Sequence, residues 1–163
     1  MSTRAAATLT TPIGELLLVS DGEALTAVQF DDGRRGSPTP GGADDPVLAE
    51  AAAQLRAYFA GERTTFDLPL RAAGTPFEQG VWDELQRIPY GETTSYGELA
   101  ARVGEPSAAR AVGRANGRNP IPVIVPCHRV IGADGSLTGF GGGLACKRAL
   151  LDLESGALSL GLA

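Results

Sequence analysis

The sequence contains few of the residue types that build disulfide frameworks and metal sites. It has two cysteines, Cys127 and Cys146, one histidine, His128, and one tryptophan among 163 residues. Two cysteines cannot form a disulfide framework, and without an export signal they indicate a reducing compartment. Because structural zinc usually takes four cysteine or histidine ligands, we expect no metal, and no cofactor of another kind.

Long apolar runs are also absent. No stretch approaches the roughly 18 apolar residues that span a bilayer, and the first ten residues lack the apolar core of a signal peptide. We therefore expect a cytoplasmic protein without a membrane partner. A composition of 43% hydrophobic and 20% charged residues excludes a disordered or fibrous chain, and the length allows one full-sized domain or two small ones.

An excess of positive charge is lacking too, since 19 acidic and 14 basic residues give a net charge of −5. This balance argues against nucleic acid as a partner. The distribution of charge along the chain favours nucleic acid instead, because residues 106–133 contain no acidic residue and four arginines, Arg110, Arg114, Arg118 and Arg129. Charge alone leaves two interpretations open, a phosphate-facing patch and a solvated helix face.

Residues 1–72 predict a scaffold domain without a catalytic constellation. Apolar runs at 13–19 and 25–30 are typical of strands, and Asp21-Gly22 between them is a hairpin turn signal. Asp45-Pro46 predicts the start of a helix that ends at Gly61, and residues 66–70 suggest a further strand. Residues 31–45 have almost nothing to bury and predict a mobile loop.

After a predicted linker at 72–74, the pattern changes to helices with strong start signals. Residues 75–78 and 95–98 read as capping boxes, and Ser107 is expected to cap a third helix that runs to about Gly117. The second and third helices, joined by a tight turn at 103–106, form a helix-turn-helix pattern. Many helical corners with this spacing bind nothing, so the pattern by itself leaves DNA binding open.

The third helix favours DNA. Arg110, Arg114 and Arg118 are spaced four residues apart and therefore share one side of the helix. The residues between them are mostly alanine and glycine, which permit close approach of the backbone to a groove. Tight packing of this helix in the core is the structural alternative.

A reactive centre is predicted where the one histidine follows a cysteine. Cys127 can act as a thiolate nucleophile, with His128 as base and Arg129 as a positive charge. Residues 121–125 look like a buried strand or extended segment, and neighbours in extended chain point to opposite sides. We therefore expect either a bridging water or a further bend of the backbone to connect the pair. Glu154, at the end of a helix from 147 to 154, is placed to orient His128. The alternative is a buried cysteine beside a surface histidine, and Cys146 is taken as structural.

Several motifs in order resemble one family. They are Ile88-Pro-Tyr-Gly-Glu-Thr-Thr-Ser-Tyr-Gly-Glu-Leu-Ala100, Ala108-Ala-Arg-Ala-Val-Gly113, Asn119-Pro-Ile-Pro122, Pro126-Cys-His-Arg-Val130 and Gly141-Gly-Gly-Leu144. Together they resemble the O6-alkylguanine–DNA alkyltransferases over residues 75–154. The resemblance implies an α+β fold: a ribonuclease-H-like N-terminal domain (1–72) with a small antiparallel sheet and a helix, a C-terminal helical domain (75–154) with a winged helix-turn-helix, and a tail (155–163).

The resemblance also implies roles for single residues. Cys127 accepts the alkyl group, His128 acts as base through water, and Glu154 orients His128. Tyr96 hydrogen-bonds the flipped guanine and helps to protonate it as it leaves, Arg110 fills the gap in the base stack, and Asn119 is the hinge between the third helix and the active-site segment. The DNA-binding set is Arg110, Tyr96, Gly97, Ala108, Arg114 and Arg118, and the substrate-binding set is Val130, Phe140 and Gly141.

The implied activity is the irreversible, single-turnover transfer of an alkyl group from guanine O6 to cysteine. The partner is alkylated double-stranded DNA, entered through its minor groove by a monomer, and the sequence leaves open O4-alkylthymine, alkyl size and cooperative binding on DNA. Phe140 stands where many members have tyrosine, and Cys146 where many have a basic residue. The rival hypotheses are a lesion sensor without catalysis and a Cys-His-Glu hydrolase. The assignment requires a cysteine sulfur that an extruded base can reach.

Overall fold

The computed structural model describes residues 5–30, 45–137, 140 and 143–156. The chain divides between Ala72 and Ala73 into two compact units. The predicted loop at 31–45, apart from Asp45, and the predicted tail beyond Gly156 lie outside the described residues.

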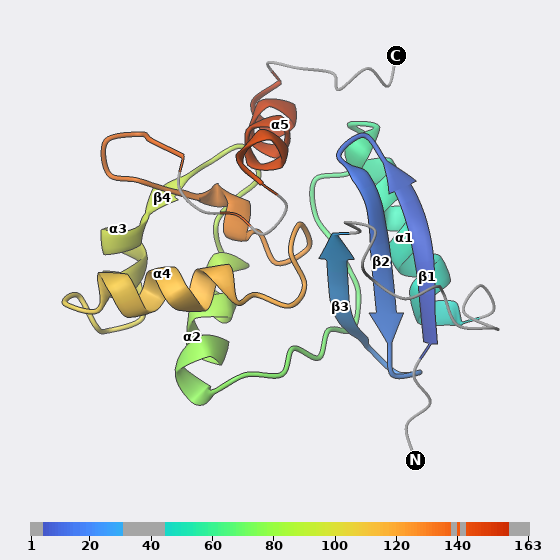
Figure 1. Cartoon of the computed structure of the whole chain (residues 1–163), viewed down its shortest axis with the longest axis horizontal. Helices are drawn as coiled ribbons and strands as arrows, with labels where there is room; N and C mark the ends of the chain where they lie inside the picture. Colours follow the sequence, from blue (N-terminus) through green and yellow to red (C-terminus); the bar gives the residue numbers. More distant parts are fainter. Residues whose placement is uncertain (1–4, 31–44, 138–139, 141–142, 157–163) are drawn as a thin grey trace. The chain divides into compact units, whose positions relative to one another are not determined.

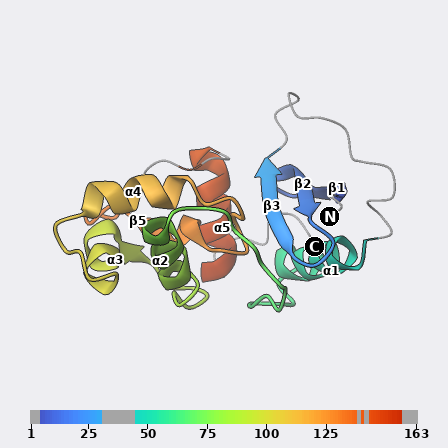
Figure 2. The ribbon, with the colours of Figure 1, turned by 90° about the horizontal axis from the view of Figure 1, so that it is seen from below.

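The first unit is a three-stranded antiparallel sheet covered on one face by a helix (Figures 1 and 2). Strands β1 (Ala5–Thr11), β2 (Gly14–Ser20) and β3 (Leu25–Phe30) lie in sequence order, with Leu9 opposite Leu16 and Leu18 opposite Val28. Leu16 and Leu18 are fully buried, as expected of alternate residues on the inner face. The second and third strands agree with the sequence prediction. The first was not predicted, because most of its residues are alanine or threonine.

Helix α1 (Pro46–Phe59) starts as predicted, since the Asp45 carboxylate accepts hydrogen bonds from the backbone N–H groups of Val47 and Leu48. The predicted strand at 66–70 is wrong. Only Leu70 pairs, in an isolated bridge with Leu25.

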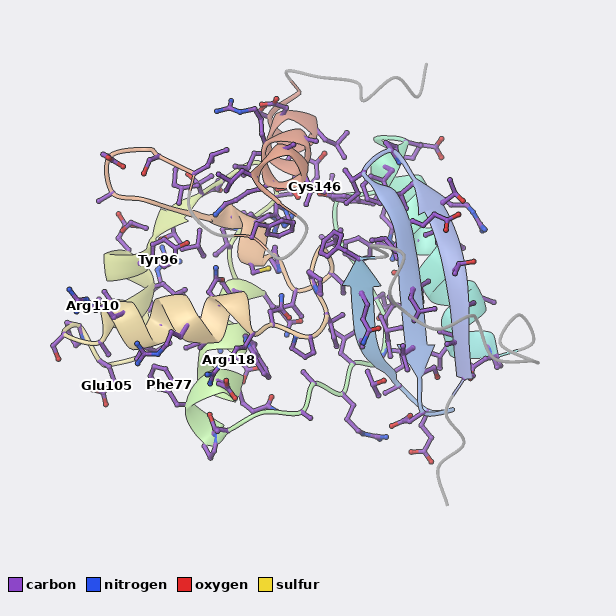
Figure 3. All side chains as sticks on the ribbon, viewed as in Figure 1. Phe77, Tyr96, Glu105, Arg110, Arg118 and Cys146 are labelled. Atoms are coloured by element: carbon purple, nitrogen blue, oxygen red, sulfur yellow. The ribbon has the colours of Figure 1, made fainter. Side chains whose placement is uncertain are left out.

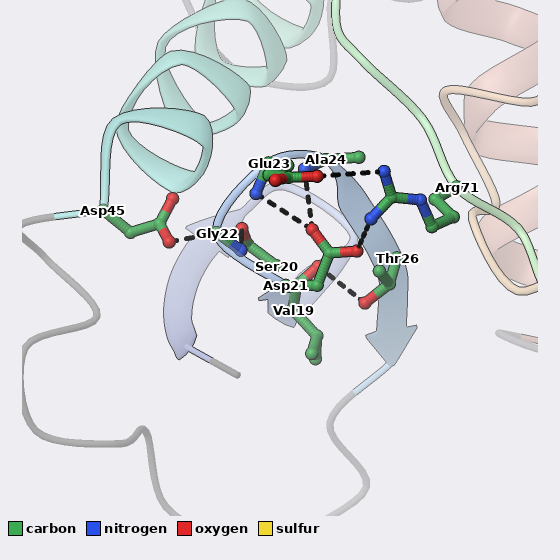
Figure 4. Close-up of polar contacts among 9 residues, drawn as sticks. All are labelled: Val19, Ser20, Asp21, Gly22, Glu23, Ala24, Thr26, Asp45 and Arg71. Atoms are coloured by element: carbon green, nitrogen blue, oxygen red, sulfur yellow. Dashed lines mark hydrogen bonds and ion pairs between the residues drawn. The ribbon is translucent and has the colours of Figure 1, made fainter. Parts of the chain in front are cut away.

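Side-chain contacts connect the β2–β3 turn to other parts of the first unit (Figure 4). The Asp21 carboxylate accepts from the N–H groups of Glu23 and Ala24, each at 2.9 Å, and forms an ion pair with Arg71. Ser20 donates a hydrogen bond to the Asp45 carboxylate at 3.2 Å. The turn is thus joined both to the start of α1 and to the end of this unit.

The second unit contains helices α2 (Pro76–Leu85), α3 (Tyr96–Arg102), α4 (Ala109–Gly117) and α5 (Leu144–Ser155). Strands β4 (Thr94–Ser95) and β5 (Val130–Ile131) pair in parallel, and a single 3₁₀ turn, η2, spans Cys127–Arg129. Helices α3 and α4 pack on each other and on α2, so the predicted helix-turn-helix is present (Figure 1). The antiparallel sheet with its helix and this helical unit confirm the predicted α+β fold class.

Local contacts fix the backbone at the start of α2, directly after the linker. Thr75 and Glu78 form the predicted capping box, with each side chain bonded to the other residue's N–H. A Cβ on Gly74 would lie 2.4 Å from the Trp82 ring, so this position requires glycine. The second predicted box is only half formed, because Ser95 caps α3 while the Glu98 carboxylate accepts from Thr94 instead.

Replacing Thr75 with alanine is expected to lower the free energy of unfolding by about 1 kcal/mol, because the N-cap hydrogen bond is lost. Ser107→Ala is the matched control: Ser107 was predicted to cap α4, but the N-cap is Ala108, without a side-chain cap bond. Urea unfolding of both variants checks this, and equal losses would contradict it.

Candidate active site

The segment before Cys127 is buried, but it is not the strand that residues 121–125 suggested. Val123 has a φ of 73°, a conformation unfavourable for a β-branched residue. Asn119 spans this turn, since its amide oxygen accepts from the Ile121 N–H at 3.0 Å and its amide nitrogen donates to the Val125 carbonyl at 2.7 Å. The Cys127 N–H donates to the same Val125 carbonyl. Asn119 therefore fixes the backbone on which Cys127 sits.

Cys127 lies in the first position of η2 and keeps only 5% of its surface exposed. Burial raises the pKa of its thiol to about 11, against the opposing effects of a hydrogen bond from Asn119 and the positive charge of Lys147. The thiol is therefore protonated in the free protein at neutral pH, and its use as a nucleophile requires a group that removes the proton.

Lys147 is the positive charge near the sulfur, and sequence reasoning missed it. Its side chain is fully buried on the inner face of α5, where its ammonium group donates to the Val130 carbonyl at 2.6 Å. Burial lowers the pKa of Lys147, while the nearby Cys127 acts to raise it. The available signal was its spacing, because Lys147, Leu150 and Glu154 recur on one helix face.

His128 is fully buried and contacts Glu154 as the sequence suggested, with Nε2 and Oε2 2.7 Å apart. Burial opposes ionisation of Glu154, but hydrogen bonds from His128 and Arg129 outweigh it and lower the Glu154 pKa to about 2. Burial also lowers the pKa of His128, so the imidazole is neutral at pH 7. Facing a carboxylate, Nε2 must carry the proton, which leaves Nδ1 as the basic nitrogen. Among the described residues Nδ1 has no hydrogen-bond partner.

Arg129 binds Glu154 instead of supplying a positive charge to the Cys127 sulfur, so that part of the prediction is wrong. Its Nε and Nη2 atoms bind the two carboxylate oxygens of Glu154 at 2.7 and 3.0 Å, and Nη1 donates to the Ile88 carbonyl at 2.6 Å. Its guanidinium carbon also lies 5.8 Å from the centre of the Tyr90 ring. The 3₁₀ turn lets His128 and Arg129 reach the same carboxylate, which extended chain would not allow.

Two side chains connect the end of α4 to its surroundings. Trp82 donates from its indole N–H to the Ala115 carbonyl at 2.8 Å, and Asn116 donates to the Cys127 carbonyl at 3.3 Å. Asn116 is buried, and its Oδ1 atom has no partner in the part of the chain that the structure describes. No sequence signal distinguished Asn116 from a surface residue.

The residues predicted to bind DNA gather around α3 and α4 (Figure 3). Arg110, Arg114 and Arg118 are exposed, which agrees with an outward-facing basic side of α4. Tyr96, at the start of α3, is half-buried, and Gly113 of α4 approaches its ring, since a Cβ there would lie 3.7 Å away. Gly97 is exposed and Ala108 is half-buried.

Of the residues predicted to bind the substrate base, Val130 is buried directly after η2 and Phe140 is half-buried. Gly141 lies outside the described residues, as do its neighbours 138–139 and 142. Within the described ranges, no group of three histidine, cysteine or acidic side chains is arranged to hold a metal ion. No helix in those ranges is long and apolar enough to cross a membrane.

Comparison with known proteins places both units in one family. Residues 6–72 match the family model "6-O-methylguanine DNA methyltransferase, ribonuclease-like domain", and residues 76–156 match the model "6-O-methylguanine DNA methyltransferase, DNA binding domain". The methylated-DNA–protein-cysteine methyltransferase of Mycobacterium bovis is 55% identical over 148 residues, 90% of each chain. A constitutive protein of that name from Bacillus subtilis is 48% identical over 153 residues, 90% of this chain and 93% of the relative.

Solved structures agree with this result. The O6-methylguanine methyltransferase of Mycobacterium tuberculosis superposes with a TM-score of 0.86 at 50% identity, covering 96% of this chain and 95% of that one. A structure of the M. tuberculosis protein OGT in complex with DNA superposes with a TM-score of 0.84 at 52% identity, covering 94% and 96%. With both family models matched and this identity over nine-tenths of its length, the chain belongs to the 6-O-methylguanine DNA methyltransferase family.

Proposed function

We propose that this protein repairs alkylated DNA directly, by moving an alkyl group from guanine O6 to the sulfur of Cys127. The observation that carries the proposal is the buried Cys127–His128–Glu154 arrangement, in which the carboxylate leaves Nδ1 of a neutral imidazole free to accept the thiol proton. Family membership, the DNA complex of a relative and the outward basic side of α4 support DNA as the substrate.

The reaction is a displacement at the alkyl carbon. The thiol proton passes to His128 Nδ1 through a water, the sulfur–carbon bond forms, and the bond between carbon and guanine O6 breaks. The guanine leaves with a proton that Tyr96 helps to supply, and the Lys147 charge stabilises the thiolate before attack. Because a thioether has no easy leaving group, each molecule reacts once.

The base must leave the duplex before the sulfur can reach it, at a cost of about a few kcal/mol. The small residues of α4 suit entry into the minor groove, where Arg110 replaces the extruded base. In this proposal residues 75–154 carry both DNA binding and chemistry, residues 1–72 act as scaffold, and Gly97, Ala108, Arg114 and Arg118 contact the backbone. Val130, Phe140 and Gly141 then line the base pocket.

Mass spectrometry after incubation with a duplex containing O6-methylguanine tests the proposal. One added CH₂, about 14 Da, is expected on the peptide that carries Cys127, once per molecule. Cys127→Ala should remain unmodified, whereas the matched control Cys146→Ser should react like the parent. A sensor would bind the duplex and stay unmodified, and a hydrolase would turn over an ester repeatedly; either result would overturn the proposal.

We further propose that the protein acts as a monomer in the cytoplasm and contacts the minor groove. Sedimentation of the free protein should give one chain per particle. Competition with a minor-groove ligand tests which groove of the duplex the protein enters. The ligand should block alkyl transfer at concentrations that leave the free thiols of the protein unmodified.

A further inference from the structure

A groove of about 150 Å³ lies between the first turn of α2 and one side of α4. The first turn contributes Thr75, Phe77 and Glu78, and α4 with the residue after it contributes Ala111, Arg114, Ala115 and Arg118. Figure 3 shows Phe77 and Arg118 on this side of the molecule, with Arg110 at the opposite end of α4. The function proposed above uses the arginines but gives the groove itself no role.

The lining combines one apolar surface with two cations. Phe77 keeps 37% of its surface exposed and is, with Leu144, one of two large hydrophobic side chains that are exposed in the described part of the chain. Arg114 and Arg118 are both exposed beside it, and the other side chains that α4 contributes to the groove, Ala111 and Ala115, are small. A groove this small does not hold a helix of another protein. An apolar face next to two guanidinium groups suits a deoxyribose followed by a phosphate.

The position of the groove also suits DNA. Helix α4 rises about 1.5 Å per residue, so Arg118 lies about 12 Å along the axis from Arg110. Phosphates of one strand are spaced about 3.4 Å apart along a duplex. For a duplex whose axis runs parallel to α4, a strand that passes Arg110 therefore reaches the groove three or four nucleotides further on.

Glu78 is the feature that does not fit a simple phosphate site. Its Oε2 atom lies 3.5 Å from Nη1 of Arg118, while its Oε1 atom accepts from the Thr75 N–H at 2.9 Å. The capping box therefore holds the carboxylate in place when Arg118 moves away. Arg118 is 71% exposed, so this long ion pair can be exchanged for a phosphate, and the remaining carboxylate then repels that phosphate.

We propose that this groove binds the sugar–phosphate backbone of DNA alongside α4, and that Glu78 competes with the phosphate for Arg118. The inference rests on DNA being the substrate and adds to it a second contact region in the first turn of α2. Glu78 thereby lowers the affinity for DNA and makes dissociation from unmodified sites faster.

Glu78→Gln tests the inference, because glutamine keeps the capping box and removes the charge. The variant should bind an unmodified duplex about three- to ten-fold more tightly at low salt, and the slope of log K against log salt should steepen by about 1. Glu84→Gln is the matched control, since Glu84 on the same helix pairs with Arg87 away from the groove. Equal effects of the two variants would reduce the result to net charge and overturn the inference.

Two further variants test the competition for Arg118 and the sugar contact separately. Glu78→Gln should give no gain in an Arg118→Gln background, and a full gain there would overturn the competition. Phe77→Ala should weaken binding by a factor that salt does not change, and an unchanged affinity would remove the sugar contact. Alkyl transfer to Cys127, measured in parallel, keeps the two proposals distinct. If transfer occurs but Glu78→Gln does not change DNA affinity, only the proposal about the groove is overturned. If Glu78→Gln changes DNA affinity but no transfer occurs, only the proposed repair reaction is overturned.

Discussion

Replacing Arg129 with methionine is expected to lower the free energy of unfolding by about 3–5 kcal/mol, the cost of leaving a buried charge without its partner. Arg129 and Glu154 have side chains that are 8% and 1% exposed and are joined by two hydrogen bonds. Without the guanidinium group, Glu154 loses two hydrogen bonds and the neighbouring positive charge, and the Ile88 carbonyl loses its donor. Urea unfolding at pH 7 measures the loss.

The matched control is Arg87→Met, which breaks an ion pair with Glu84 in which the arginine is 73% exposed. Exposed pairs contribute little, so this variant should unfold almost like the parent. Arg129→Lys keeps the charge but not the paired hydrogen bonds, and its stability should fall between the two. A loss for Arg129→Met no larger than that for Arg87→Met would show that the buried pair does not stabilise the fold.

The same pair predicts how stability depends on pH. The Glu154 pKa is about 2 in the folded protein against 4.5 for a free glutamate. A depressed folded pKa contributes stability that is complete above pH 4.5 and is lost as the pH falls toward 2. In Arg129→Met the folded pKa rises toward the unfolded value, so this part of the acid sensitivity should largely disappear. Urea titrations at pH 3, 4 and 6 test the difference.

Replacing His128 with glutamine is expected to slow single-turnover alkyl transfer by about 100- to 10,000-fold, the usual contribution of a general base. Burial raises the pKa of the Cys127 thiol to about 11, so little thiolate exists at pH 7 without a proton acceptor. Glutamine retains a donor for Glu154 but has no basic nitrogen. Rapid-quench assays with an O6-methylguanine duplex measure the rate.

The pH profile distinguishes a base from a merely structural residue. Because burial lowers the pKa of His128, the imidazole stays neutral below its ordinary value of 6.5. The transfer rate of the parent should therefore hold down to below pH 6.5 and fall only where His128 is protonated, and that fall should be absent in His128→Gln. DNA affinity should be the same in both proteins. An unchanged rate at pH 7 would exclude His128 as the base.

Local signals predicted the helices better than the strands. Asp45, Thr75 and Ser95 each cap a helix as expected, because capping depends on residues within one turn. Strand β1 went unpredicted, since its alanines and threonines lack a strong apolar pattern and its stability comes from pairing with β2. Ser107 has the right residue type for a cap, but α4 begins one residue later without it.

The candidate site was predictable in its residue types but not in its geometry. Adjacency of Cys127 and His128, with Glu154 in the last helix, indicated which groups to consider. The 3₁₀ turn that brings His128 and Arg129 onto one carboxylate follows a segment with a positive φ at Val123, and no local sequence pattern predicts either feature. The burial of Lys147 beside the sulfur depends on how α5 packs, and a lysine at a helix start normally reads as solvent-exposed.

The bond from Asn116 to the Cys127 carbonyl links α4, the helix proposed to enter the groove, directly to the backbone of the proposed nucleophile. Trp82 holds the preceding residue of that helix through the Ala115 carbonyl, so the helix end cannot shift without straining one bond or the other. On the binding mode proposed above, a duplex that contacts α4 would therefore also act on the backbone that carries the Cys127 sulfur. Docking of the helix and orientation of the sulfur would then be coupled.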